Sequence, residues 1–181
     1  MTRARVYDTL IVGTGFTGIG AAIKLTQAGV DDIVIVERDQ RVGGTWRDNT
    51  YPGAACDIPS LLYSFSFVAN PTWSRAYSPA TEIHQHIEDM VDRFDLRRRI
   101  DFGTEVNGLT FDEDAGVWDV ATTGRKRYRA RTVVLASGPL PDHKLPDIRG
   151  IDTYEGHTIH SARWDHDYDF TGKRVAVIGT G

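Results

Sequence analysis

This sequence of 181 residues contains a single cysteine and no long apolar run. Cys56 is the only cysteine, so the chain forms no disulfide within itself, and this usage suits a reducing compartment. The apolar run near the N-terminus leads directly into a glycine-rich turn, and it is far too short for the core of a signal peptide or for a spanning helix. We therefore expect a cytoplasmic protein without a transmembrane segment.

An excess of positive charge is also missing. The chain has 21 basic and 25 acidic residues and a formal net charge of −4, which argues against a nucleic-acid partner. The only dense cationic run, RKRYRAR at 125–131, alternates with Tyr128 and Ala130, which favours an exposed strand face over a polyanion site. Hydrophobic residues make up 40 % of the sequence, enough for a globular core.

Glycine, by contrast, is abundant, with 18 residues. Three of them lie in GTGFTG, residues 13–18, between two apolar runs. The run at 7–12 predicts a strand, and the run at 33–37 predicts a second strand that is buried on both faces of a parallel sheet. Apolar residues at helical spacing from Ile19 to Ala28 predict a helix that ends at Gly29. The result is a βαβ unit.

The glycine turn of this unit has the pattern of a dinucleotide-binding site. Gly13 allows the tight turn, Gly15 lets the backbone approach a pyrophosphate, and Gly18 lets helix and strand pack closely. The start of the helix then offers unpaired N–H groups to the phosphates. Glu37 ends the second strand, where a carboxylate accepts hydrogen bonds from an adenosine ribose and disfavours a 2′-phosphate. The unit therefore predicts FAD or NAD rather than NADP.

The next segments read as a loop and a helix. Residues 41–59 are dense in turn formers and aromatics and are too long for a plain linker. Ser78-Pro79 predicts the start of a helix, with the serine as N-cap and the proline at the first helical position. One apolar stripe along this helix consists of Ile83, Ile87, Met90, Val91 and Phe94.

Short strands follow from residue 104 onward. Those expected at 104–111, 117–122 and 126–130 form an antiparallel meander, and 132–137 is expected to return to the parallel sheet. Proline-rich residues 138–150 mark a boundary. The chain closes with a second strand-and-glycine pattern at 173–181, similar to the first.

Histidines invite a metal-site interpretation, which the sequence does not favour. His157, His160 and His166 lie near one another in the sequence, but no second cluster of cysteines or carboxylates at ligand spacing accompanies them, so no metal is expected. His84 and His86 are two residues apart on the predicted helix and cannot share a face, so we expect both to be solvated.

Two further motifs carry a resemblance to a known family. Residues 43–57, GGTWRDNTYPGAACD, resemble the flavin-facing loop of class B flavoprotein monooxygenases. Residues 154–165 are similar to the Baeyer–Villiger fingerprint F-x-G-x-x-x-H-x-x-x-W-[P/D], with Tyr154 in place of phenylalanine. The matching positions are Gly156, His160, Trp164 and Asp165. The N- and S-oxygenating sister group has Tyr or Phe and then Lys or Arg at the last two positions, so the resemblance favours the Baeyer–Villiger branch.

This resemblance implies an α/β fold in three parts. Residues 1–140 would form a Rossmann-like FAD-binding domain, whose parallel sheet carries an antiparallel β-meander. Residues 141–172 would be a linker with the fingerprint, in which His160 and Trp164 couple domain movement to turnover. Residues 173–181 would start a second, NADPH-binding Rossmann-like domain.

The resemblance also implies site residues. The expected FAD contacts are Gly13, Gly15, Phe16, Thr17, Gly18, Glu37, Gly44, Thr45, Trp46, Asp57, Tyr63, Val106 and Ser137. The expected NADP contacts are Ala55, Cys56, Thr180 and Gly181. Cys56 is interpreted as a packing or flavin-adjacent thiol rather than a nucleophile. Asp57 has an indirect catalytic role, because in the family it orients an arginine that would lie beyond residue 181.

The implied reaction uses FAD, NADPH and O2 to insert one oxygen atom next to a ketone carbonyl, which gives an ester or a lactone. Three alternatives stay open at this point. The protein could oxygenate nitrogen or sulfur instead, or the chain could be the non-catalytic, flavin-binding product of a truncated gene. An NAD-dependent dehydrogenase is the third alternative, disfavoured by residues 43–57 and by the fingerprint.

Overall fold

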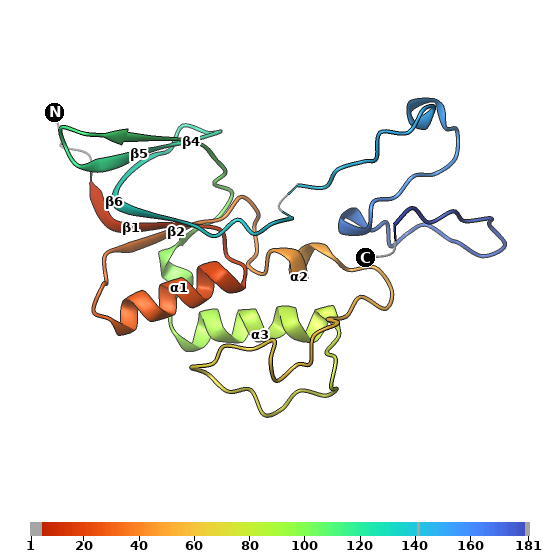
Figure 1. Cartoon of the computed structure of the whole chain (residues 1–181), viewed down its shortest axis with the longest axis horizontal. Helices are drawn as coiled ribbons and strands as arrows, with labels where there is room; N and C mark the ends of the chain where they lie inside the picture. The colour runs from red at the N-terminus through yellow and green to blue at the C-terminus, as the bar shows by residue number, and fades with distance from the viewer. Residues whose placement is uncertain (1–4, 141, 180–181) are drawn as a thin grey trace.

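A computed structural model describes residues 5–140 and 142–179, and it confirms the α/β class with one mixed sheet in the order β3-β2-β1-β6-β5-β4 (Figure 1). The strands are β1 (Val6–Val12), β2 (Ile33–Val36), β3 (Ile100–Asp101), β4 (Val106–Asp112), β5 (Val117–Thr122) and β6 (Arg127–Leu135). The helices are α1 (Phe16–Gln27), α2 (Thr45–Asp48) and α3 (Ala80–Arg93), with 3-10 turns η1 (Arg97–Arg99), η2 (Ile151–Thr153) and η3 (Ser161–Arg163). Among these described helices, none has the length and apolarity that crossing a membrane requires.

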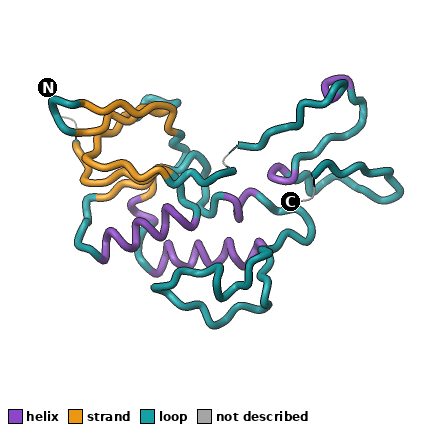
Figure 2. The backbone as a smooth tube through the Cα atoms, viewed as in Figure 1, coloured by secondary structure: helices purple, strands orange, loops and turns teal. Residues whose placement is uncertain are grey.

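The parallel centre of the sheet is buried on both faces, as the apolar runs predict. β1 pairs in parallel with β2 and with β6. Leu10 and Val34 face the meander strands, whereas their neighbours Ile11 and Ile35 face α1 and α3. Figures 1 and 2 show α1 and α3 on one side of the parallel strands β1 and β2, while β4 and β5 of the same sheet curve over the other side. The layers therefore place both helices beneath the strands that carry the glycine turn.

β6 corrects the expectation of two separate strands at 126–130 and 132–137. It is one continuous strand of nine residues. Its first half pairs antiparallel with β5, while most of its length pairs in parallel with β1. No turn former lies between the two expected strands, so the backbone continues and changes only its partner.

The cationic run on β6 is a strand face, as its alternation predicts. Tyr128 and Ala130 are buried in the core, and Arg127 and Arg131 are exposed. Arg129 donates to the carboxylates of Asp119 and Asp112 at 2.7 and 2.6 Å. Lys126 pairs with Asp101 of β3 at 3.0 Å, and Arg131 lies 3.6 Å from Asp8 of β1, so these basic side chains form ion pairs with several strands of the sheet.

α1 begins earlier than the spacing of its apolar residues predicts. Its first residue is Phe16 and not Ile19, with Gly15 at the N-cap and Ala28 at the C-cap, directly before Gly29. Because α1 starts inside the glycine motif, the N–H groups of its first turn belong to that motif. This start brings the helix N-terminus to the ends of β1 and β6.

α3 has the expected buried stripe but a different start. Its N-cap is Pro79, and no side chain caps it. The hydroxyl of Ser78 instead lies 2.7 Å from that of Ser60, and both serines are buried. The prediction that Ser78 caps the helix is therefore wrong. Ser78 instead connects the start of α3 to Ser60, which follows the glycine-aromatic loop, residues 43–57.

Residues 142–179 form an extended arm that contains only η2 and η3 as regular elements (Figure 2). The strand expected in residues 173–181 is absent from the described part of this segment, and Val177 is 83 % exposed. A strand requires a partner for its ladder, and no described segment pairs with these residues. Thr180 and Gly181 lie outside the described residues.

The contact between α1 and the glycine turn allows a test of the fold. Gly18→Ala should destabilise the protein, because the new Cβ would overlap the carbonyl oxygen of Gly13, a backbone atom. We expect a loss of about 1–3 kcal/mol, as for other overpacked sites, measured by urea denaturation. Gly15→Ala is the control, since a Cβ there has no neighbour within 4 Å, and we expect a smaller loss of stability, that of an alanine replacing a glycine at an N-cap. Equal midpoints for Gly18→Ala and wild type would show that this contact is not tight.

Candidate functional site: a nucleotide pocket at the glycine turn

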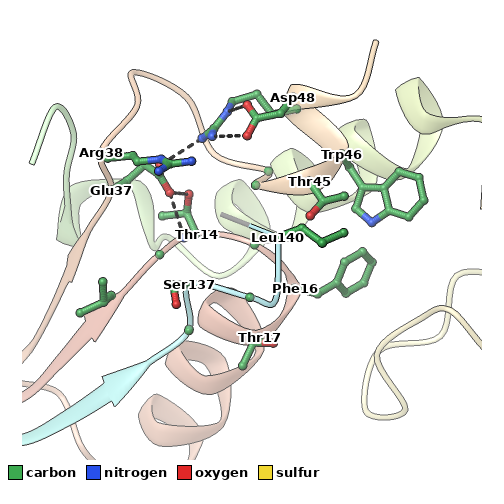
Figure 3. A pocket seen from close by; sticks show the side chains of 18 of the residues that line it. Thr14, Phe16, Thr17, Glu37, Arg38, Thr45, Trp46, Asp48, Ser137 and Leu140 are labelled. Atoms are coloured by element: carbon green, nitrogen blue, oxygen red, sulfur yellow. Dashed lines mark hydrogen bonds and ion pairs between the residues drawn. The ribbon is translucent and has the colours of Figure 1, made fainter. Parts of the chain in front are cut away.

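A pocket of about 360 Å³ opens where β1, β2 and β6 end and α1 begins (Figure 3). It gathers residues from six separate segments of the chain. The predicted site residues that line it are Gly13, Gly15, Phe16, Thr17, Glu37, Gly44, Thr45, Trp46, Tyr63, Val106 and Ser137. Figure 3 shows Glu37 and Thr14 at one end of the pocket and Phe16 and Trp46 at the other. One end is thus charged and the other aromatic.

Glycines form the part of the wall where the helix starts. A Cβ on Gly13 would lie 2.7 Å from the carbonyl oxygen of Ala136, and the φ of Gly13 is +102°. A Cβ on Gly15 would meet nothing within 4 Å, so the space in front of the α1 N-terminus is open. Gly44 approaches this turn so closely that its Cβ would lie 3.4 Å from the Cα of Gly15. The two glycine loops leave room for an anion at the N–H groups of α1.

Glu37 follows β2 and is buried at the charged end. Its Oε2 accepts from the backbone N–H of Thr14 at 3.0 Å and from the Thr14 hydroxyl at 2.5 Å. Its Oε1 accepts from the N–H of Asp39 at 3.0 Å and from the guanidinium of Arg47 at 3.1 Å. The carboxylate is therefore held from the glycine turn, from its own loop and from α2.

Arg47 is the counter-ion of this end, and its side chain is only 5 % exposed. It forms a two-point contact with Asp48, at 2.8 and 3.0 Å, and lies 3.5 Å from Asp39. Burial alone would lower the pKa of Arg47, but the hydrogen bonds to Asp48 and the charges of Glu37, Asp48 and Asp39 outweigh it and raise the pKa. Arg47 therefore stays cationic.

The aromatic end is formed by Phe16, Trp46 and Tyr63. The ring of Tyr63 meets Phe16 edge-on at 5.0 Å and Trp46 edge-on at 5.4 Å. The indole N–H of Trp46 donates to the Tyr63 hydroxyl at 2.9 Å. Burial raises the pKa of Tyr63. This hydroxyl therefore stays protonated at neutral pH and completes a rigid aromatic wall.

Other predicted site residues lie outside the pocket wall. Gly18 is buried beneath the glycine turn. Ala55 and Asp57 are exposed on the loop that follows α2, while Cys56 is buried and accepts at Sγ from the N–H of Ile58 at 3.4 Å. The structure does not bring Ala55, Cys56 or Asp57 into contact with the pocket, so their roles stay predictions.

The fingerprint segment 154–165 reaches the same loop through ring and hydrogen-bond contacts. Trp164 lies 6.3 Å from the ring of Tyr51, and His166 Nε2 lies 2.9 Å from the hydroxyl of Thr50. Within the segment, Asp165 pairs with His157 at 3.0 Å. The fingerprint is therefore adjacent to the glycine-aromatic loop and not remote from it.

The remaining fingerprint residues have local roles. His160 caps η3 by accepting from the N–H of Ala162 at 3.1 Å. Tyr154 is exposed, and its ring overlaps the space that a Cβ on Gly156 would take. Across residues 5–140 and 142–179, no three or more His, Cys, Asp or Glu side chains come together as metal ligands would.

Comparison with known proteins identifies the family. A family model described as pyridine nucleotide-disulphide oxidoreductase matches residues 10–181, nearly the whole chain. The chain belongs to this family.

Similar proteins within this family are Baeyer–Villiger monooxygenases. The chain is 51 % identical to the Baeyer–Villiger monooxygenase of Streptomyces coelicolor over 94 % of its own length and 33 % of that protein. It is 44 % identical to cyclohexanone monooxygenase from Rhodococcus sp. Phi1 bound to NADP+, with a TM-score of 0.89, covering 99 % of this chain and 34 % of that one.

A third similar structure is the OTEMO complex with FAD and NADP, at 32 % identity and a TM-score of 0.85, covering 95 % of this chain and 34 % of that one. The chain thus spans about a third of the length of the relatives it matches. The resemblance expected from the two motifs is confirmed.

Thr14 and Arg47, which both hold Glu37, are among the pocket residues of this family member that sequence reasoning missed. Thr14 occupies a variable position of the glycine motif, so no pattern singles it out. Arg47 adjoins the expected contact Trp46, but its partner Glu37 lies ten residues upstream. The only feature of the sequence that indicates this role of Arg47 is its charge, within a loop that otherwise contains many glycines and aromatics.

The expectation that His86 is solvated is wrong. Its side chain is 4 % exposed, and Nε2 has no hydrogen-bond partner in the part of the chain that the structure describes. The ring lies 6.2 Å from Phe16 and Phe65 and 5.0 Å from Trp73. Burial lowers the pKa of His86, with an opposing effect of Asp89. His86 lies three residues after Ile83 and four before Met90, so it borders the buried stripe, and the loop that contains Phe65 and Trp73 covers it there.

His84 is also not solvated, because it is partly buried with Nε2 2.9 Å from the carbonyl oxygen of Val42. His84 and His86 border the main stripe on its two sides, where loops that pack on α3 cover them. Both histidines of α3 are therefore covered, each by a different loop.

The burial of His86 predicts a pH dependence of stability. Its pKa is lower in the folded than in the unfolded protein, so the unfolded state takes up a proton first as the pH falls below about 6.5. The free energy of unfolding should therefore decrease from pH 7 to pH 5, and this decrease should be smaller in His86→Phe. Urea denaturation at a series of pH values measures it, with His143→Phe, an exposed site, as control. Parallel curves for wild type and His86→Phe would contradict the prediction.

Proposed function

We propose that this chain is the FAD-binding part of a Baeyer–Villiger monooxygenase. The observation that carries the proposal is the convergence of the glycine turn, Glu37 and the glycine-aromatic loop on one pocket, with the fingerprint segment in contact with that same loop. The similarity to the Streptomyces coelicolor enzyme supports the same reaction class.

The pocket fits FAD in shape and in chemistry. The open space at Gly15 and the N-terminus of α1 suit the pyrophosphate, and Glu37 suits the adenosine ribose. Tyr63 and its aromatic neighbours suit the isoalloxazine side, and the backbone at Val106 suits the adenine side. When bound, FAD reduced by NADPH supplies the chemistry that activates O2.

The remaining segments would serve the binding of NADPH and the oxygenation of the ketone. Asp57 would hold a catalytic arginine supplied from outside this chain, since a carboxylate orients a guanidinium by two-point hydrogen bonding. Ala55 and Cys56 lie on the same loop and would adjoin the nicotinamide. Residues 141–172 would link the FAD domain to an NADPH domain that begins at 173–181, where Thr180 and Gly181 would meet the pyrophosphate of NADPH.

The proposed reaction converts a ketone, O2, NADPH and a proton into an ester or lactone, water and NADP+. One oxygen atom enters the bond beside the carbonyl carbon and the other leaves as water. A cyclic ketone is the first substrate to test, because a cyclohexanone monooxygenase is among the similar structures. The cytoplasm is the proposed compartment, since the buried Cys56 is a free thiol.

An assay on the full-length protein tests this function. We expect FAD absorbance in the purified protein, and oxygen-dependent NADPH oxidation that accelerates with cyclic or linear ketones. Mass spectrometry should find the lactone or ester in amounts equal to the NADPH that the ketone consumed.

Other outcomes separate the alternatives. Oxidation of amines or sulfides with no ester product would assign the protein to the N- and S-oxygenating group. Purified protein without flavin absorbance would favour an NAD-dependent dehydrogenase. A stop codon directly after codon 181 would instead identify a non-catalytic flavin-binding remnant.

A further inference from the structure

Arg47 is the only arginine or lysine buried among the residues that the structure describes, and it lies at the pocket wall. A buried cation is costly unless its hydrogen-bonding groups are paired. The side chain of Arg47 meets this requirement through Asp48, Glu37 and the carbonyl oxygen of Arg41, which accepts from Nη1 at 2.8 Å. The two-point contact with Asp48 uses Nε and Nη2, so Nη1 is the group directed at Glu37.

Glu37 is held from several directions in this arrangement, because it accepts four hydrogen bonds and lines the pocket. Three of them come from the neutral donors of Thr14 and Asp39, and only Arg47 brings a positive charge within hydrogen-bond distance. Arg38, the nearest other cation in sequence, lies 2.6 Å from the exposed Asp142.

We propose that Arg47 is a positioning residue for recognition of the adenosine ribose, and that it acts by holding the Glu37 carboxylate oriented toward the pocket. This inference rests on the proposed FAD site. Without Arg47, the buried carboxylate of Glu37 would lose its charged hydrogen-bond partner and would turn away from the pocket wall toward solvent. This change removes the acceptor that distinguishes a ribose from a sugar without hydroxyls.

The test compares two ligands on the full-length protein after removal of its flavin. One ligand is FAD, and the other is an FAD analogue that carries 2′,3′-dideoxyadenosine. Binding is followed by the change in flavin fluorescence. In wild type we expect FAD to bind at least about tenfold more tightly than the analogue, as is typical of hydrogen bonds to a charged group.

In Arg47→Met the affinity for FAD should fall about tenfold or more, while the affinity for the analogue changes little, so that the ratio approaches about one. Glu37→Gln should lower the ratio similarly, and the double variant should add no further loss. Arg41→Met is the matched control: it replaces an exposed arginine of the same loop and keeps the backbone carbonyl that contacts Arg47.

The outcomes distinguish a failure of the proposed role of Arg47 from a failure of the proposed FAD site. Equal losses for FAD and the analogue in Arg47→Met would show a merely structural role and overturn the inference, as would an unchanged ratio. Failure of the wild type to bind FAD at all would overturn the proposed function as well. If Arg47→Met does not fold, as judged by circular dichroism, Arg47→Lys carries the test: it keeps the charge without the planar fork and should give an intermediate ratio.

Discussion

The close contact between the first turn of α1 and the ends of the central strands sets the geometry of the site. Gly18 lies against the carbonyl group of Gly13, and Gly13 lies against the backbone of Ala136. The N–H of Gly13 bonds to Val36 at 2.9 Å, so the turn is fixed to β2 as well. A side chain at either glycine would push the helix away from the sheet. The N-terminus of α1 can face an anion only because both positions have none.

The loop that carries α2 adds the two ends of the pocket from consecutive residues. Trp46 joins the aromatic end through Tyr63, while Arg47 joins the charged end through Glu37. Neighbouring residues of a helix point in different directions, so one short helix reaches both ends. Gly44 approaches Gly15 at the base of this loop, and a larger residue there would move α2 away from the glycine turn. The selectivity of both ends therefore depends on the same backbone contact as the phosphate region.

Local periodicity was enough to predict the βαβ unit, β5 and the apolar stripe of α3, because each depends on residues close in sequence. It was not enough for His86, whose burial depends on Phe65 and Trp73 in a loop that covers the helix from outside. The bond between Arg47 and Glu37 is likewise formed between segments. The motif predicts which residues line the pocket, whereas partners at long range decide which charges are buried there.

The arm at 142–179 also shows the difference between local composition and partners at long range. Its residues 175–178 have the alternation-free, β-branched composition of a buried strand, yet they are exposed and unpaired in the described chain. A strand is a property of at least two segments, so composition alone does not produce one. The fingerprint segment of the same arm does find partners, in Thr50 and Tyr51. Those two residues come just after Asn49, the C-cap of α2, so a displacement of the arm would act first on the loop next to the helix that carries Trp46 and Arg47.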